Sequence, residues 1–282
     1  KLIFILLMRL PFCIISCYYI VALILISCGD PPDVGGDIDP PVTTFVTASD
    51  TTFTSSSITL QWQGNETARI FDYQLQYNSI SDTTITIISD AIDSTSITFH
   101  NLDEGDYTFI INGRYDIDNI ESVKNLHFTV DAISGPALRI YPISQTAQPG
   151  DSITVHLYFE EVPADSAVTG LHVDINIDPD EFEFIPAKYE NGDLITGFNG
   201  TTIWPSPSYN DGTMLIDGVA DESGVGLYGT GSIVEFHLKV LASEGILNIS
   251  IGENSLFLNI DGDPIGFRNT VGGLVNVLEV DE

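Results

Sequence analysis

Carboxylates are the side chains of this sequence with the greatest capacity for chemistry. The 282 residues include 40 Asp and Glu against 9 Lys and Arg, and several acids stand close together, as in Glu160-Glu161 and Asp221-Glu222. Two carboxyl groups across a cleft could hydrolyse a glycosidic bond, and loop carboxylates could hold Ca²⁺. With so many acidic residues, some pair will lie at the separation that glycoside hydrolysis needs by chance alone, so the pairs do not predict an enzyme. Asp178, Asp180 and Asp221 are the candidate calcium ligands.

The histidines give no pattern of a catalytic or metal centre. They stand singly on separate predicted strands, where each is expected to be a sheet-surface or edge residue: His100, His127, His156, His172 and His237. The sequence contains no H-E-x-x-H, G-x-S-x-G or Walker pattern. We therefore expect a protein that is not an enzyme.

The net charge limits the partners. The formal charge is −31 at pH 7, and such a field repels nucleic acid and anionic lipid head groups. Neutral glycans, cations and basic protein partners remain compatible with it. The acidic surface equally suits a solvated protein that is secreted or exposed to salt, so the charge alone does not choose between these readings.

The three cysteines, Cys13, Cys17 and Cys28, predict the processing of the chain. Met8-Arg9 is followed by an apolar run from Leu10 to Ile26, as in a signal peptide that starts at Met8. Removal of residues 1–27 would leave Cys28 as the sole cysteine, which excludes an intramolecular disulfide.

The segment Leu25-Ile26-Ser27-Cys28 resembles the lipobox of bacterial lipoproteins. The resemblance implies that the Cys28 thiol is lipidated and tethers the protein to a membrane of the bacterial cell envelope, at the cell surface or on the periplasmic face of the outer membrane. The alternative is a plain transmembrane anchor with an incidental cysteine, for which the apolar run is marginally short.

Period-two alternation dominates the remaining sequence and predicts strands. The clearest runs are 58–62, 73–77, 85–87, 97–99, 107–111, 153–159, 171–177 and 234–240. The segment 28–44 is rich in Pro, Gly and Asp and predicts a flexible linker, and the segment 131–137 breaks two strand runs. We expect an all-β protein with two sandwiches in tandem, at residues 45–131 and 137–280.

The first predicted domain contains the run Leu102-Asp103-Glu104-Gly105-Asp106-Tyr107, with Trp62 on an earlier strand. This pattern resembles the corner of fibronectin type III and related Ig-like domains, in which a tyrosine hydroxyl bonds back to the backbone. The resemblance implies a sandwich that commonly serves as a spacer.

The second predicted domain carries a series of motifs in the order found in cohesin domains, the receptor modules of cellulosome scaffolds. They are Pro149-Gly150-Asp151, Asp178-Pro179, Gly192-Asp193-Leu194, Asp221 to Gly224, Phe236 to Val240, and Gly272 to Val277. The resemblance implies a jelly-roll sandwich that binds dockerin, a small calcium-loaded module carried by polysaccharide-degrading enzymes or anchors.

Dockerin recognition in the cohesin family uses one sheet face, with an Asn and an Asp early in the strand before the Asp-Pro pair. Gly170 and His172 occupy these positions here and depart from the family pattern. By alternation, His172, Asp174 and Asn176 are the exposed partner-binding candidates on this strand. The alternative is that they only solvate the outer face.

Trp204 and Tyr209 lie on a Pro-rich segment and form a second candidate site. If exposed, the rings could stack on sugars or anchor a partner; if buried, they are lids on the end of the sandwich. Three functions therefore remain open: a protein-docking lipoprotein, a glycan-binding surface lipoprotein, and a structural envelope or adhesion protein.

Overall fold

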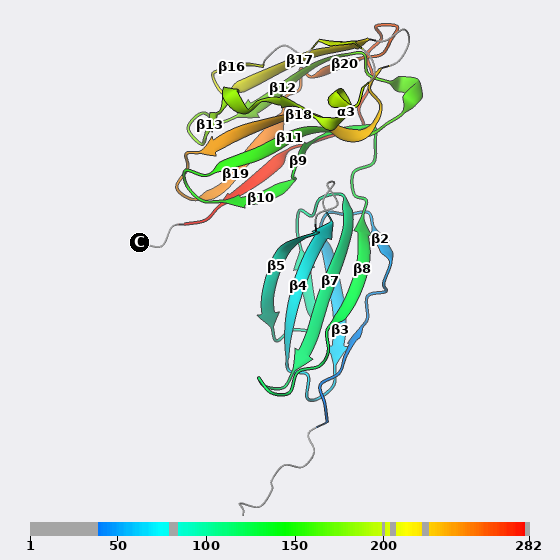
Figure 1. Cartoon of the computed structure of the whole chain (residues 1–282), viewed down its shortest axis with the longest axis vertical. Coiled ribbons are helices and arrows are strands. Elements are labelled where there is room, and N and C mark those ends of the chain that lie inside the picture. The colour runs from blue at the N-terminus through cyan, green and yellow to red at the C-terminus, as the bar shows by residue number, and fades with distance from the viewer. Residues whose placement is uncertain (1–38, 79–83, 199–200, 204–206, 222–225, 280–282) are drawn as a thin grey trace, which may run out of the picture.

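The computed structural model describes residues 39–78, 84–198, 201–203, 207–221 and 226–279 (Figure 1). These residues are almost entirely strands, as the alternation predicted. They form an N-terminal unit, residues 43–130, and a C-terminal unit, residues 137–277. The predicted leader and Cys28 lie outside the described residues. None of the helices that the structure describes has the length and apolar character needed to cross a bilayer.

The N-terminal unit packs two sheets face to face. One has the order β1-β3-β6 and the other the order β2-β8-β7-β4-β5. The strands are β1 Thr43–Phe45, β2 Thr51–Phe53, β3 Ile58–Gly64, β4 Ile70–Asn78, β5 Thr84–Ile92, β6 Ser96–Phe99, β7 Gly105–Arg114 and β8 Lys124–Val130. Trp62 is buried at the centre, with its ring 5.6 Å from that of Phe71 and 5.7 Å from that of Phe109.

The predicted tyrosine corner is present in this unit. The Tyr107 hydroxyl donates to the Asp103 carbonyl at 3.0 Å, and the Tyr107 ring stacks on Phe128 at 5.2 Å. Gly105 has φ 135°, a conformation that L side chains rarely adopt, and a Cβ there would meet the Tyr77 ring at 2.8 Å. The residues of the corner therefore fix the loop from Asn101 to Gly105 against the sheet.

The C-terminal unit also has two sheets. The larger follows the order β10-β22-β19-β12-β17-β15, with β16 and β20 paired at its side, and the smaller the order β13-β18-β11-β9-β21, with β14 on β18. The strands are β9 Ala137–Tyr141, β10 Ser144–Ala147, β11 Ser152–Val162, β12 Gly170–Ile177, β13 Phe182–Phe184, β14 Glu190–Asn191, β15 Thr201–Ile203, β16 Ser208–Asn210, β17 Thr213–Asp221, β18 Gly229–Val240, β19 Gly245–Ile251, β20 Leu256–Leu258, β21 Asn269–Val271 and β22 Gly273–Val277. Short helices connect them: η1 Ala164–Ser166, η2 Pro186–Lys188 and α3 Asp193–Thr196.

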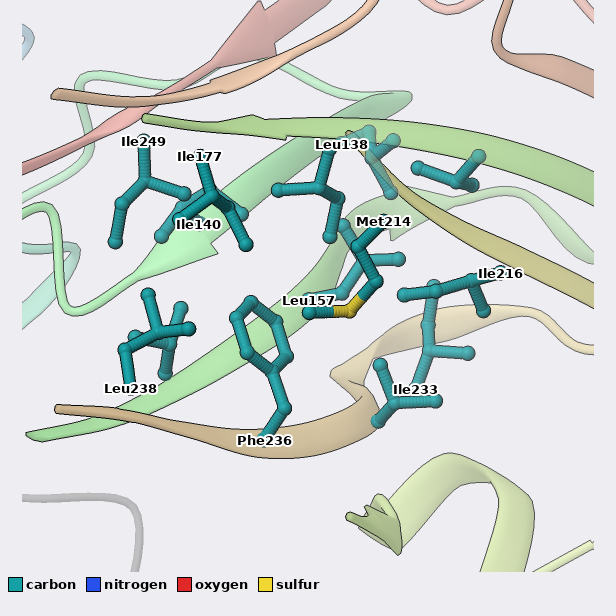
Figure 2. Packing of buried hydrophobic residues seen from close by; sticks show 14 of the residues in the cluster. Leu138, Ile140, Leu157, Ile177, Met214, Ile216, Ile233, Phe236, Leu238 and Ile249 are labelled. Carbon is teal, nitrogen blue, oxygen red and sulfur yellow. The ribbon is translucent and has the colours of Figure 1, made fainter. Parts of the chain in front are cut away.

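A single apolar cluster fills the space between these two sheets (Figure 2). Alternate residues of β11 and β18, such as Leu157 and Phe236, point inward and are fully buried. They meet Met214 of β17 and Ile177 of β12 from the opposite sheet, as Figure 2 shows. The period-two pattern of the sequence thus identified the core side of these strands.

Two motifs predicted in the C-terminal unit each stabilise a local structure. Gln148 to Asp151 form a turn in which the Asp151 N–H donates to the Gln148 carbonyl at 3.1 Å, with Gly150 at φ 87°. Pro at the second and Gly at the third position suit a type II turn. Asp193 holds α3 against β18, because its carboxylate accepts from the Ser232 hydroxyl at 2.6 Å.

The two units contact each other through a buried ion network. Alternation places Arg139 on the outer face of its sheet, yet it is only 2% exposed. Its Nε donates to Glu160 at 2.9 Å, and its Nη1 lies 3.5 Å from Asp103 of the N-terminal unit. Asp103 also accepts the Ile143 N–H at 2.8 Å. The tyrosine corner of the first unit therefore covers one face of the second.

Candidate functional site: an open sheet face

The outer face of the larger sheet in the C-terminal unit is the candidate site. Its centre is β12, which pairs antiparallel with β17 on one side and with β20 on the other. Figure 1 shows these three strands on the side of the unit farthest from the N-terminal unit. Residues directly opposite in antiparallel strands share a face, so the register determines which side chains meet.

Two rows of cross-strand neighbours form the centre of this face. His172 lies opposite Asp217 of β17 and Leu256 of β20, and Gly170 lies opposite Val219 and Leu258. Val219 is 46% and Leu256 44% exposed. Because Gly170 has no side chain, the face presents a polar centre at His172 beside an apolar strip formed by Val219, Leu256 and Leu258.

His172 bridges two carboxylates. Its Nδ1 is 2.7 Å from Asp217 Oδ1, and its Nε2 is 3.1 Å from Asp174 Oδ1. The hydrogen bond with Asp217 raises the pKa of His172, and the charges of Asp217 and Asp174 act in the same direction, while partial desolvation opposes them. We call this group the carboxylate–histidine bridge.

Asp174 is buried at 7% exposure, so the expectation that it is an exposed partner-binding residue is wrong. The segment after β19 covers it: the Asn254 amide donates to Asp174 Oδ2 at 3.2 Å, and the Asp174 N–H donates to the Ser255 hydroxyl at 3.2 Å. The buried Asp174 carboxylate thus helps to position the His172 ring. His172 and Asn176 do lie on the outer face as expected, with Asn176 exposed and its amide 3.4 Å from the Ser250 hydroxyl.

Of the three predicted calcium ligands, Asp221 lies apart from Asp178 and Asp180. The Asp178 carboxylate accepts the Asp180 N–H at 2.9 Å in the turn after β12, close to Thr213 at the start of β17. Asp221 stands at the other end of β17, eight residues and about 26 Å away along an extended strand. Within the described part of the chain, no three His, Cys, Asp or Glu side chains are placed to hold a metal ion.

Tyr209 does not offer an exposed ring. It is half-buried, its ring lies 5.7 Å from that of Phe184, and its buried hydroxyl has no hydrogen-bond partner among the residues that the structure describes. Burial raises its pKa. Tyr209 therefore packs as a lid on the core, which is the second of the two alternatives for this segment. Trp204 lies outside the described residues.

The histidines are less isolated than the sequence suggested. His156 of β11 and His237 of β18 flank Glu235, whose carboxylate lies 3.8 Å from His156 Nδ1 and 3.2 Å from His237 Nε2. Desolvation lowers the pKa of His156. Sequence analysis missed this grouping and missed Asp217 and Leu256, because only the pairing of strands distant in sequence brings these residues together.

Comparison with protein-family models matches residues 140–259 to the cohesin domain. Strands β21 and β22 extend the two sheets beyond this match. A comparison with curated proteins gave no match.

Three solved structures illustrate what the chain is similar to. One is a non-cellulosomal cohesin from the archaeon Archaeoglobus fulgidus, at 17% identity and a TM-score of 0.40, covering 51% of this chain and 91% of that one. A type I cohesin–dockerin complex from Clostridium thermocellum matches at 20% identity and a TM-score of 0.40, with coverage of 51% and 92%. A type III cohesin module from a cell-surface anchoring scaffoldin of Ruminococcus flavefaciens matches at 16% identity and a TM-score of 0.40, with coverage of 51% and 87%.

Proposed function

We propose that this chain is a docking protein that binds a partner carrying a dockerin module, because residues 140–259 match the model of the cohesin domain. Cohesin domains are non-catalytic binding modules, so we assign no reaction to this one. The match to the cohesin family carries the proposal. One of the similar solved structures, from Clostridium thermocellum, contains a cohesin together with a dockerin.

The outer face around β12 is the docking surface in this proposal. It combines exposed apolar side chains, Val219 and Leu256, with the polar centre at His172. Stable protein interfaces have an apolar core inside a polar rim, and this face offers both. Its strands lie on the side of the C-terminal unit farthest from the N-terminal unit (Figure 1).

Substitution of Leu256 by Asp tests the docking surface. Leu241 is the matched control, because it is also 44% exposed but follows β18 in the smaller sheet. Calcium-loaded dockerin modules encoded in the same genome serve as probes, with affinity measured by calorimetry. We expect Leu256→Asp to weaken binding at least tenfold, since a buried carboxylate without a partner is costly at an interface, and Leu241→Asp to leave it unchanged. Failure of every module to bind the unaltered chain would refute the function; equal effects of the two variants would refute the surface.

We further propose that the chain is a lipid-anchored protein of the bacterial cell envelope, tethered through Cys28. The support is the sequence Leu25-Ile26-Ser27-Cys28 after an apolar run. Metabolic labelling with an alkyne fatty acid should modify the unaltered chain and a Cys17→Ser control but not Cys28→Ser. A Cys28→Ser variant that is still processed and found in the membrane fraction would overturn the anchor.

The N-terminal unit serves as a spacer in this proposal and resembles a fibronectin type III domain. The tyrosine corner of Tyr107 and Asp103 supports the resemblance. Its contact with the C-terminal unit through Asp103 and Arg139 would hold the docking surface in one orientation relative to the tether.

A further inference from the structure

The contacts of the carboxylate–histidine bridge favour the protonated ring of His172. Both ring nitrogens of His172 contact carboxylate oxygens, at 2.7 Å to Asp217 and 3.1 Å to Asp174. A neutral imidazole carries one N–H, and an ionised carboxylate can only accept. The Asp217 contact is a hydrogen bond, whereas Asp174 Oδ1 has no hydrogen-bond partner among the described residues and meets the ring only as an ion pair. The cationic ring therefore satisfies both contacts, while a neutral ring protonated at Nδ1 keeps the bond to Asp217 and places Nε2 and Asp174 Oδ1 together as two acceptors.

The surroundings provide no other cation for the two carboxylates. Within the described residues, the ion pairs of Asp174 and Asp217 are those with His172. The neighbour from β20, Leu256, is apolar. The segment after β19 contributes the neutral Asn254, which donates to Asp174, and an exposed Glu253 that forms no ion pair with His172. Deprotonation of His172 thus leaves a local charge of −2 where the bridge had −1.

The two carboxylates differ in what they can do once the ring is neutral. The Asp174 side chain is 11% exposed and stays bonded to Asn254. The Asp217 side chain is 60% exposed and lies on the open surface beside Leu256 and Val219. Asp217 is therefore the carboxylate that becomes available to a partner.

We propose that His172 makes docking depend on pH: loss of the ring's positive charge leaves the exposed Asp217 carboxylate without a counter-charge, so that it pairs with a Lys or Arg of the partner, whose apolar side chains cover Leu256 and Val219. This inference rests on the proposed docking function and names the chemistry of its partner. The charge of the chain, −31, favours a cationic partner over an acidic one and speeds its approach. Affinity consequently rises with pH through the range in which His172 loses its proton.

Calorimetry between pH 5.5 and 9 with the same calcium-loaded dockerin modules tests the switch. We expect the affinity of the unaltered chain to rise at least about fivefold over this range, within the usual span of couplings between sites. In His172→Gln no imidazolium pairs with Asp217, so the variant should bind with an affinity that does not change with pH. Asp217→Asn should bind weakly at high pH. His127→Gln, which alters an exposed histidine of the N-terminal unit, controls for titration elsewhere.

A measurement on the chain alone separates the switch from the docking function. Nitrogen NMR of the imidazole side chains should show His172 doubly protonated in the bridge, with a titration midpoint that falls in Asp217→Asn. An unchanged midpoint, or a pH profile of binding that is the same in His172→Gln, would overturn the switch and leave docking intact. Absence of binding at every pH would overturn the docking function and the switch with it.

Discussion

Replacement of Arg139 by Met should destabilise the chain strongly, because it removes the cation from a buried ion network. Arg139 is 2%, Glu160 7% and Asp103 9% exposed. The Arg139 guanidinium bonds Glu160 at 2.9 Å and lies 4.3 Å from the centre of the Tyr158 ring. Methionine keeps much of the side-chain volume but leaves two buried carboxylates without a counter-charge. Removal of one partner of a buried pair costs about 3–5 kcal/mol.

Arg114→Met is the matched control. Arg114 pairs with Asp72 at the same 2.9 Å, but the two side chains are 23% and 38% exposed. Exposed ion pairs contribute about 0–1 kcal/mol, since water screens them. The two variants carry the same substitution, and the ion pairs that they remove differ in burial.

Equilibrium urea unfolding followed by circular dichroism measures the difference. With a denaturant slope of about 2–3 kcal/mol per molar, the Arg139 variant should unfold at a urea concentration about 1–2.5 M lower than the unaltered chain. Addition of Asp103→Asn and Glu160→Gln to Arg139→Met should recover at least half of the loss, because the unpaired charges cause it. Equal midpoints for the Arg139 and Arg114 variants would refute the reasoning.

Three further variants test other parts of the structure. Burial raises the pKa of Asp103 to about 6, above the 3.8 of the unfolded chain, so the folded state binds more protons and stability falls by about 3 kcal/mol as pH rises from about 4 to 6. Thermal melts of Asp103→Asn across this range should lack that loss. Tyr107→Phe removes a buried hydroxyl that donates at 3.0 Å, and urea unfolding should show a loss of about 1–2 kcal/mol; an unchanged midpoint would mean that ring packing alone holds the corner. Phe236→Ala, at a fully buried position, should cost about 3–5 kcal/mol in the same assay, against less than about 0.5 kcal/mol for Ile246→Ala, which is 68% exposed; similar costs would contradict the assigned core.

The strands of the fold could be predicted from the sequence because their signals are local. Alternation identified β3, β4, β6, β7, β11, β12 and β18, and the core side of β11 and β18 followed from the same pattern. The run 85–87 also forms a strand, β5, yet Ile85 and Ile87 are 47% and 45% exposed. Among the described strands β5 pairs only with β4, at the edge of its sheet, and sequence periodicity does not report which strand lies at an edge.

The candidate site was only partly predictable, because it depends on contacts across strands. Alternation placed His172 and Asn176 on an outer face correctly. It failed at Asp174, which alternates outward but is covered by Asn254 and Ser255 from about 80 residues further along the chain. No local sequence pattern predicts that residues so far along the chain will bury a side chain.

The sequence by itself determined that this chain is built of strands, the approximate places of many of them, and the positions of the tyrosine corner and the Pro-Gly turn. Side-chain alternation and turn chemistry act over a few residues, so they can be read without a fold. Only the tertiary structure decided that Asp217 meets His172, that Asp221 lies far from Asp178, and that the N-terminal unit buries Arg139. Strand pairing and the packing of the two units set these neighbours, and both join residues that are distant in sequence.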